Sequence, residues 1–104
     1  MTIEEIRRIY KSSKVKWSQH CLQRMGERDI SIDDVSSCID TGEIIEDYPD
    51  DYPHPSCLIL GFRLNNKGLL HIVVGTDGDF LYMITAYIPS EKWFDADGRK
   101  RKER

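Results

Sequence analysis

The sequence predicts an α+β fold, with two to three N-terminal helices followed by a four-stranded antiparallel β-meander. Helical periodicity with capping residues fills the first part of the chain, and short apolar runs of strand type fill the rest. Two turns of hairpin type, Asn65–Gly68 and Thr76–Asp79, separate the last three runs. A chain of 104 residues with 39% apolar residues suits one folded domain.

Three capping residues mark the predicted helix starts: Thr2, Ser18 and Ser31. The first helix is expected over residues 3–12, with acidic residues in its first turn and a lysine near its end, as the helix dipole favours. The second helix is expected to end near residues 26–29. The third has Asp34 three residues after Ser31, as in a capping box, and Gly42 as its stop.

The four expected strands follow: Glu43–Tyr48, Ser56–Leu64, Leu69–Gly75 and Phe80–Ile88. The segment Asp47–Pro55 contains three prolines, so most of it must form a loop. Trp93 and Phe94 are expected on a short C-terminal helical turn. Residues 1–98 are expected to form the single domain, and the basic tail 99–104 is expected to be mobile because it lacks an apolar anchor.

The composition favours a cytoplasmic protein with free thiols. Cys21, Cys38 and Cys57 form no paired motif, and no apolar run resembles a signal peptide or a transmembrane segment. We therefore expect no membrane partner. The spacing between the cysteines and the histidines fits no zinc pattern, so we expect neither a metal nor another cofactor.

The net charge of −3 disfavours general binding to nucleic acid, and no DNA partner is expected. The charges are nevertheless unevenly distributed. Residues 1–28 hold seven basic and three acidic residues, whereas residues 29–56 hold nine acidic residues and no Lys or Arg. A basic face can bind phosphate locally, because salt screens charge beyond about 8 Å. The alternative is a solvated surface on which the charges cluster by chance.

The second predicted helix carries His20, Arg24 and Arg28 at four-residue spacing. At about 100° per residue, these side chains form a stripe beside the apolar face of the helix. The arginine fork matches phosphate oxygens, and histidine titrates near neutral pH. The stripe therefore indicates a phosphate site. A solvated helix edge, with arginines paired to nearby carboxylates, explains the same spacing.

Strand alternation places His71, Thr85 and Tyr87 on one side of the sheet, where they would form the second half of the site. In this reading Thr85 and Tyr87 share their face with Leu81 and Met83. The arrangement requires His71 in line with Thr85, and a one-residue slip would separate them. His71 could equally be a half-buried structural histidine.

The chain resembles the domain-of-unknown-function family 4258 over residues 17 to about 93. The residues that carry the resemblance are His20-x-x-x-Arg24-Met25-x-x-Arg28-x-Ile30, Gly42-Glu43-Ile44-Ile45-Glu46-x-Tyr48-Pro49, Leu70-His71 and Thr85-Ala86-Tyr87-x-Pro89. That family is similar to the fold shared by barnase-like, colicin-type and RelE-like ribonucleases. The resemblance implies a metal-independent RNA endonuclease of a toxin–antitoxin system, neutralised by an antitoxin-like protein.

The residue types fit this chemistry. Such cleavage needs a base for the 2′-hydroxyl, an acid for the leaving 5′-oxygen and cations for the charged phosphorane. The expected catalytic residues are His20, Arg24, His71 and Thr85, and the expected substrate-binding residues are Arg28, Tyr87 and Arg63. Tyr87 would stack on an unpaired base.

Two other interpretations stay open. The chain could be a non-catalytic relative that binds RNA or a protein partner through the same face, and the free edge near Glu43–Tyr48 would suit docking by strand addition. It could also be an unrelated enzyme, or a metal protein built on the loop with Asp47, Asp50 and Asp51. A distance below about 8 Å between His20 and His71, with Arg24 between them, would favour the endonuclease.

Overall fold

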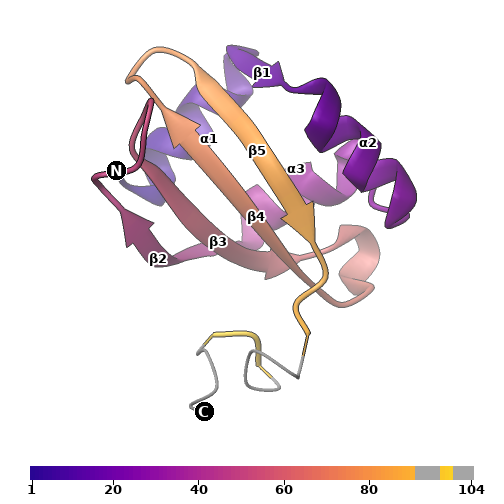
Figure 1. Ribbon diagram of the computed structural model, residues 1–104. Coiled ribbons are helices and arrows are strands. Elements are labelled where there is room, and N and C mark those ends of the chain that lie inside the picture. Colours follow the sequence, from indigo (N-terminus) through magenta and orange to yellow (C-terminus); the bar gives the residue numbers. More distant parts are fainter. Residues whose placement is uncertain (91–96, 100–104) are drawn as a thin grey trace.

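A computed structural model of the chain describes residues 1–90 and 97–99 (Figure 1). The α+β class predicted from the sequence is confirmed. The elements in chain order are α1 (Ile3–Lys11), β1 (Val15–Trp17), α2 (Gln19–Glu27), α3 (Ile32–Thr41), β2 (Glu43–Tyr48), β3 (Ser56–Phe62), the 3-10 turn η1 (Leu64–Asn66), β4 (Leu69–Thr76) and β5 (Leu81–Tyr87). The helical turn expected at Trp93 and Phe94 lies outside the described residues.

The three predicted helix caps are confirmed. The side-chain oxygens of Thr2, Ser18 and Ser31 each accept a backbone N–H three residues further on. The capping box is also present, because the Asp34 carboxylate accepts the Ser31 N–H at 3.0 Å. These local hydrogen bonds fix where each helix begins, which is why the sequence located them well.

Gly42 ends α3, as predicted, but for a different reason. Its φ of −92° is open to any residue. A Cβ at Gly42, or at Gly61 on β3, would instead clash with the Cys38 carbonyl oxygen. The two glycines therefore allow the end of α3 to pack directly on β3.

The sheet has five strands in the order β1-β5-β4-β3-β2. The antiparallel order of the last four strands is confirmed. The prediction of a four-stranded, wholly antiparallel sheet was wrong, because a fifth strand, β1, pairs parallel with β5 at the edge of the sheet opposite β2. Three residues with a lysine in the middle are too short for a periodic signal, so this strand could not be recognised from the sequence.

The pairing of β4 with β5 shifts by one residue at Ile84. Val73 lies opposite Thr85, whereas Val74 lies opposite Met83. This bulge reverses the alternation within β5. Leu81 and Met83 consequently enter the core, and the prediction that they share a face with Thr85 and Tyr87 was wrong.

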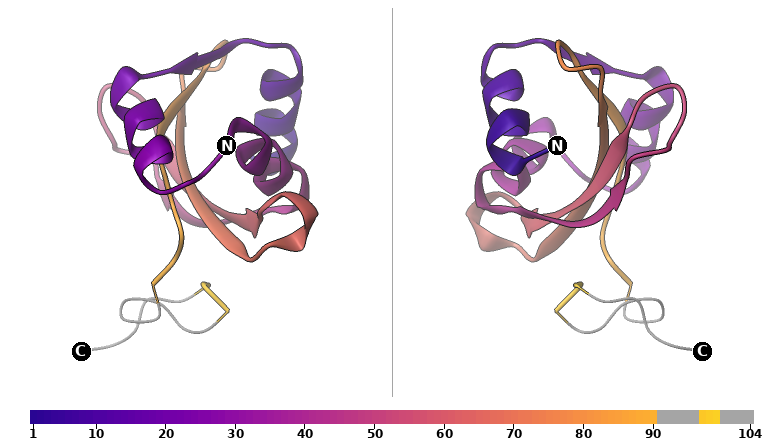
Figure 2. Two further views of the ribbon diagram at one scale, coloured as in Figure 1. Left: turned by 90° about the vertical axis from the view of Figure 1, so that its right-hand side faces the viewer. Right: turned by 90° about the vertical axis from the view of Figure 1, so that its left-hand side faces the viewer.

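Helices α1 and α3 cover one face of the sheet, and α2 packs beside β5 (Figures 1 and 2). The core between them contains Ile6, Ile9, Cys21, Met25, Ile30, Val35, Cys38, Ile39, Cys57, Ile59, Leu70, Ile72, Val74, Leu81, Met83 and Ala86. We call the opposite face of the sheet the open face; by strand alternation it carries His71, Tyr82, Thr85 and Tyr87. In the part of the chain that the structure describes, no helix has both the length and the apolar character needed to cross a membrane.

Candidate functional site

Helix α2 presents the basic stripe along one edge of β5. Trp17, at the end of β1, pairs with Met83, so α2 begins beside the middle of β5. Cys21 and Met25 on one side of α2 are buried in the core, which leaves His20 exposed on the other. The stripe predicted from helix periodicity thus lies at the surface next to β5.

Arg28, at the end of α2, contacts β5 directly. Its guanidinium donates to the Ala86 carbonyl oxygen at 2.8 Å and to the Thr85 hydroxyl at 3.5 Å. Within the described residues, β1 pairs with Leu81–Met83 alone, so the Ala86 carbonyl lies beyond the end of β1. Arg28 and Tyr87, with Ile88, line a hollow of about 510 Å³. The structure therefore brings three of the candidate residues, Arg28, Thr85 and Tyr87, to one place.

His20 and Arg24 are exposed further along the same edge. The Arg24 guanidinium donates to the Glu27 carboxylate at 3.2 Å, with both side chains about half exposed. An exposed pair of this kind contributes only about 0.3–0.5 kcal/mol, so Glu27 holds the Arg24 side chain weakly. His20 lines a second hollow, of about 430 Å³, whose other residues are Lys16, Trp17, Ser18, Tyr82, Met83 and Ile84.

His71 is fully buried on the open face. Its Nε2 donates to the Gly98 carbonyl oxygen at 2.8 Å, and its Nδ1 lies 3.4 Å from the Tyr87 hydroxyl. Gly98 has a φ of +74°, and a Cβ there would lie 3.2 Å from the side chains of Leu60 and Leu69. The segment Asp97–Arg99 therefore packs over His71, whose ring has no exposed surface in this structure.

Arg63 is held inside the fold. It donates to the Asp34 carboxylate at 3.1 and 3.3 Å and to the Asp29 carbonyl oxygen at 2.7 Å. Burial alone would raise the pKa of Asp34, but donors from Ser31, Arg63 and Leu64 lower it overall. These contacts join the α2–α3 connection to the end of β3, and Arg63 is not among the residues that line the two hollows beside α2.

The sequence did not indicate an aromatic cluster beside His20. The rings of His54 and Tyr82 are stacked, with centroids 4.6 Å apart and planes 15° from parallel. The Lys16 ammonium lies 4.8 Å from the Phe80 ring centroid and 6.0 Å from that of Tyr82. No periodicity links His54, in the proline-rich loop, to a strand so distant along the chain.

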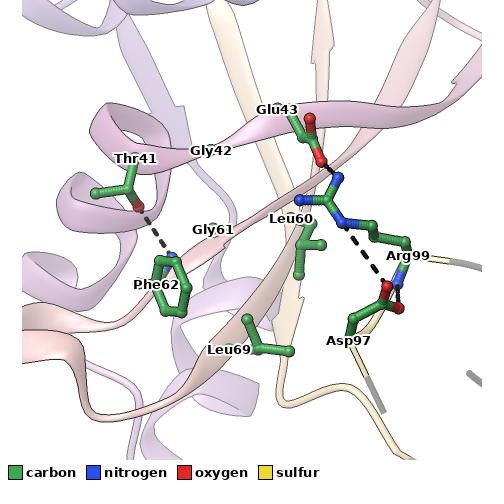
Figure 3. A pocket seen from close by; sticks show the side chains of 9 residues that line it. All are labelled: Thr41, Gly42, Glu43, Leu60, Gly61, Phe62, Leu69, Asp97 and Arg99. Carbon is green, nitrogen blue, oxygen red and sulfur yellow. Dashed lines mark hydrogen bonds and ion pairs between the residues drawn. The ribbon is translucent and has the colours of Figure 1, made fainter. Parts of the chain in front are cut away.

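A third hollow, of about 540 Å³, lies where the chain returns to the sheet near its C-terminal end (Figure 3). It is lined by Thr41, Gly42, Glu43, Leu60, Gly61, Phe62, Leu69, Asp97 and Arg99. Arg99, assigned from the sequence to the basic tail, forms ion pairs with Glu43 and Asp97. The charges of this hollow are thus already paired, and none of the candidate site residues lines it.

The thiols are buried. Burial raises the pKa of Cys38 and Cys57 to about 12 and also raises that of Cys21. None of the three is therefore a reactive thiolate at neutral pH. Among the described residues, no three side chains of His, Cys, Asp or Glu are grouped so that they could hold a metal ion.

The fold and the surface beside α2 define a small α+β domain, with a mixed sheet and a histidine–arginine stripe beside β5. A family model described as "Domain of unknown function (DUF4258)" matches residues 17–88, which is more than half of the chain. The protein belongs to this family. Neither a curated protein nor a solved structure matches the chain significantly.

Proposed function

We propose that the protein is a metal-independent RNA endonuclease of toxin–antitoxin type, acting in the cytoplasm. The observation that carries the proposal is the placement of Arg28 beside Thr85 and Tyr87, on the same edge of β5 as the exposed His20. Guanidinium groups, a hydroxyl and an imidazole on one accessible edge are the groups that phosphodiester transfer requires. The ribonuclease fold that the resemblance to family 4258 implies would fit the same assignment.

The reaction uses the 2′-hydroxyl of the RNA as nucleophile. A base removes the proton from O2′, O2′ forms a bond to phosphorus, and the bond from phosphorus to O5′ breaks. An acid gives its proton to O5′, which leaves a 2′,3′-cyclic phosphate and a 5′-hydroxyl. His20 would transfer one of these protons, and Arg24 and Arg28 would stabilise the charged phosphorane.

The burial of His71 favours a second candidate function. With Nε2 bonded to Gly98 and the ring fully covered, His20 has no accessible histidine partner on β4. The protein would then be a non-catalytic relative that binds RNA, or a protein partner, through the same face. Such a protein partner could add a strand at β2, which among the described residues pairs with β3 alone and is an outer strand of the sheet.

Single-turnover cleavage of RNA in the presence of EDTA tests the proposal. Wild-type protein should yield cyclic phosphate ends, and Arg24→Ala should lower the rate about 100-fold or more, as loss of one positioned donor does. His20→Ala should abolish cleavage. Arg8→Ala, which removes an exposed arginine from α1, is the matched control and should leave the rate unchanged.

Two results would count against the endonuclease. The first is activity that disappears in EDTA and returns with a divalent cation. The second is an absence of cleavage together with RNA binding that still depends on Arg24, which would establish the non-catalytic relative instead. Growth arrest on expression, relieved by His20→Ala, would support the toxin role.

A further inference from the structure

The stacked pair of His54 and Tyr82 is the feature of this surface that the endonuclease chemistry does not require. Tyr82 lies on β5 at the open face, and His54 reaches it from the loop between β2 and β3. Both side chains are partly exposed. A stacked pair of rings contributes about 0.5–1.5 kcal/mol beyond its buried area, which helps to hold this loop in place.

The Tyr82 ring is held in one orientation. Its hydroxyl donates to the Asp77 carboxylate at 2.8 Å, and that carboxylate also accepts the N–H groups of Asp79 and Phe80 at 2.9 and 2.8 Å. These donors, the Phe80 N–H foremost, lower the pKa of Asp77 far below its usual value, so it is charged at neutral pH. Tyr82 is therefore positioned before any ligand arrives.

The stack adjoins the hollow that contains His20. Tyr82, Lys16 and His20 all line this hollow, whose volume of about 430 Å³ falls in the range of small-ligand sites, about 300–1,000 Å³. Lys16 contributes an exposed cation that lies over the Phe80 and Tyr82 rings, and no carboxylate among the described residues forms an ion pair with it. A flat ring, a cation and an imidazole thus converge on one space.

We propose that Tyr82, fixed by His54, is the platform on which an unpaired base of single-stranded RNA stacks, and that Lys16 binds an adjacent phosphate. The inference rests on the proposed function for its ligand class, and it names the nucleotide subsite next to His20. Aromatic rings bind bases of any identity in this way, because every base has a π-face. Tyr87 suits the role less well, because its ring packs edge-on against the buried His71, with centroids 5.3 Å apart.

The test measures binding without cleavage. A labelled 2′-O-methyl oligonucleotide, which lacks the nucleophile, is titrated by fluorescence anisotropy beside an abasic oligomer of equal length and charge. Tyr82→Ala should weaken binding of the base-containing oligomer about 5- to 150-fold, since stacking is worth about 1–3 kcal/mol per base. Binding of the abasic oligomer should not change. Tyr82→Phe, which keeps the ring, should retain most of the affinity.

Further variants separate the parts of the platform. His54→Ala should weaken binding of the base-containing oligomer alone and, as a loop substitution, it keeps the test valid if Tyr82→Ala does not fold. Tyr52→Ala, on the same loop with a side chain 92% exposed, is the control and should have no effect. Lys16→Ala should weaken binding of both oligomers and lower the slope of log affinity against log salt by about one.

The outcomes distinguish this inference from the proposed function. Tyr82-dependent binding without RNA cleavage would uphold the platform and refute the endonuclease. RNA cleavage would leave the endonuclease standing and refute the platform alone in either of two cases. In one, the protein binds the base-containing and abasic oligomers equally; in the other, its RNA affinity is unchanged in Tyr82→Ala and His54→Ala. Absence of RNA binding would overturn both. A partner protein whose binding, unlike that of RNA, depends on Tyr82 would refute the platform alone.

Discussion

Replacement of Arg63 by alanine should destabilise the fold and leave RNA affinity unchanged. The sequence assigns Arg63 to substrate binding, but its guanidinium donates twice to Asp34 and once to the Asp29 carbonyl oxygen. The side chains of Arg63 and Asp34 are only 17% and 8% exposed. Arg63 is thus a structural link between the α2–α3 connection and the end of β3.

The contacts set the size of the effect. Breaking a buried ion pair costs about 3–5 kcal/mol, because one charge stays buried without its partner. In Arg63→Ala the Asp34 carboxylate keeps two backbone donors, the N–H groups of Ser31 and Leu64, so we expect a smaller loss of about 2–3 kcal/mol. For a domain of this size, that loss lowers the melting temperature by about 10–20 °C.

Urea unfolding followed by circular dichroism measures the loss, and a double-mutant cycle with Asp34→Ala should give a coupling energy of about 1–2 kcal/mol. Lys67→Ala, an exposed substitution in the connection between β3 and β4, where Arg63 also lies, serves as control. An unchanged unfolding midpoint in Arg63→Ala, together with weaker RNA binding, would show that Arg63 contacts substrate and that our interpretation of the ion pair is wrong.

The same pair gives a pH dependence with a defined sign. The pKa of folded Asp34 is lowered, so its contribution to stability is complete above the pKa of the unfolded state, about 3.9, and is lost as the pH falls through the folded value. The stability difference between wild type and Asp34→Asn should therefore shrink in acid. A difference that stays constant down to about pH 2 would contradict the ionised pair.

Two further predictions use glycines with matched controls. Gly61→Ala should destabilise the protein by about 1–3 kcal/mol, because the new Cβ would clash with a backbone carbonyl of α3. Gly26→Ala on α2, with open space around it, should instead stabilise the protein by about 0.5–1 kcal/mol. Urea unfolding measures both free-energy changes. Gly98→Val should make His71 reactive to diethyl pyrocarbonate, detected by mass spectrometry, while Gly78→Val, which has a similar positive φ but no neighbours, should leave His71 protected. Equal unfolding energies for the first pair, or equal labelling for the second, would refute the packing arguments.

Local chemistry explains why much of the fold was predictable. Caps such as Ser18 and Ser31 act within three residues, and the turns at Asn65–Gly68 and Thr76–Asp79 join strands that are neighbours in the chain. β1 has no such signal, because its partner β5 lies at the other end of the sequence. The bulge at Ile84 was equally invisible, since an extra residue changes the alternation without changing the composition.

The candidate site residues were likewise predictable only in part from the sequence. Periodicity on a single helix was enough to place His20 and Arg24 at the surface. It could not show that Arg63 pairs with Asp34 or that His54 stacks on Tyr82, because each contact joins elements that only the tertiary fold brings together. A residue type suited to phosphate chemistry is therefore insufficient evidence of a role until its neighbours are known.

The need to know a residue's neighbours matters most for the proposed function at His71. Strand parity placed it correctly on the face with Thr85 and Tyr87, but its burial depends on Gly98, which approaches from the C-terminal segment. Two accessible proton-transfer groups are needed for cleavage, and His71 supplies one only if Asp97–Arg99 moves away. A Gly98→Val variant that exposes His71 should cleave RNA faster if His71 is that group. If exposure of His71 leaves the rate unchanged, its role is structural, and the second proton carrier must lie near His20 on the β5 edge.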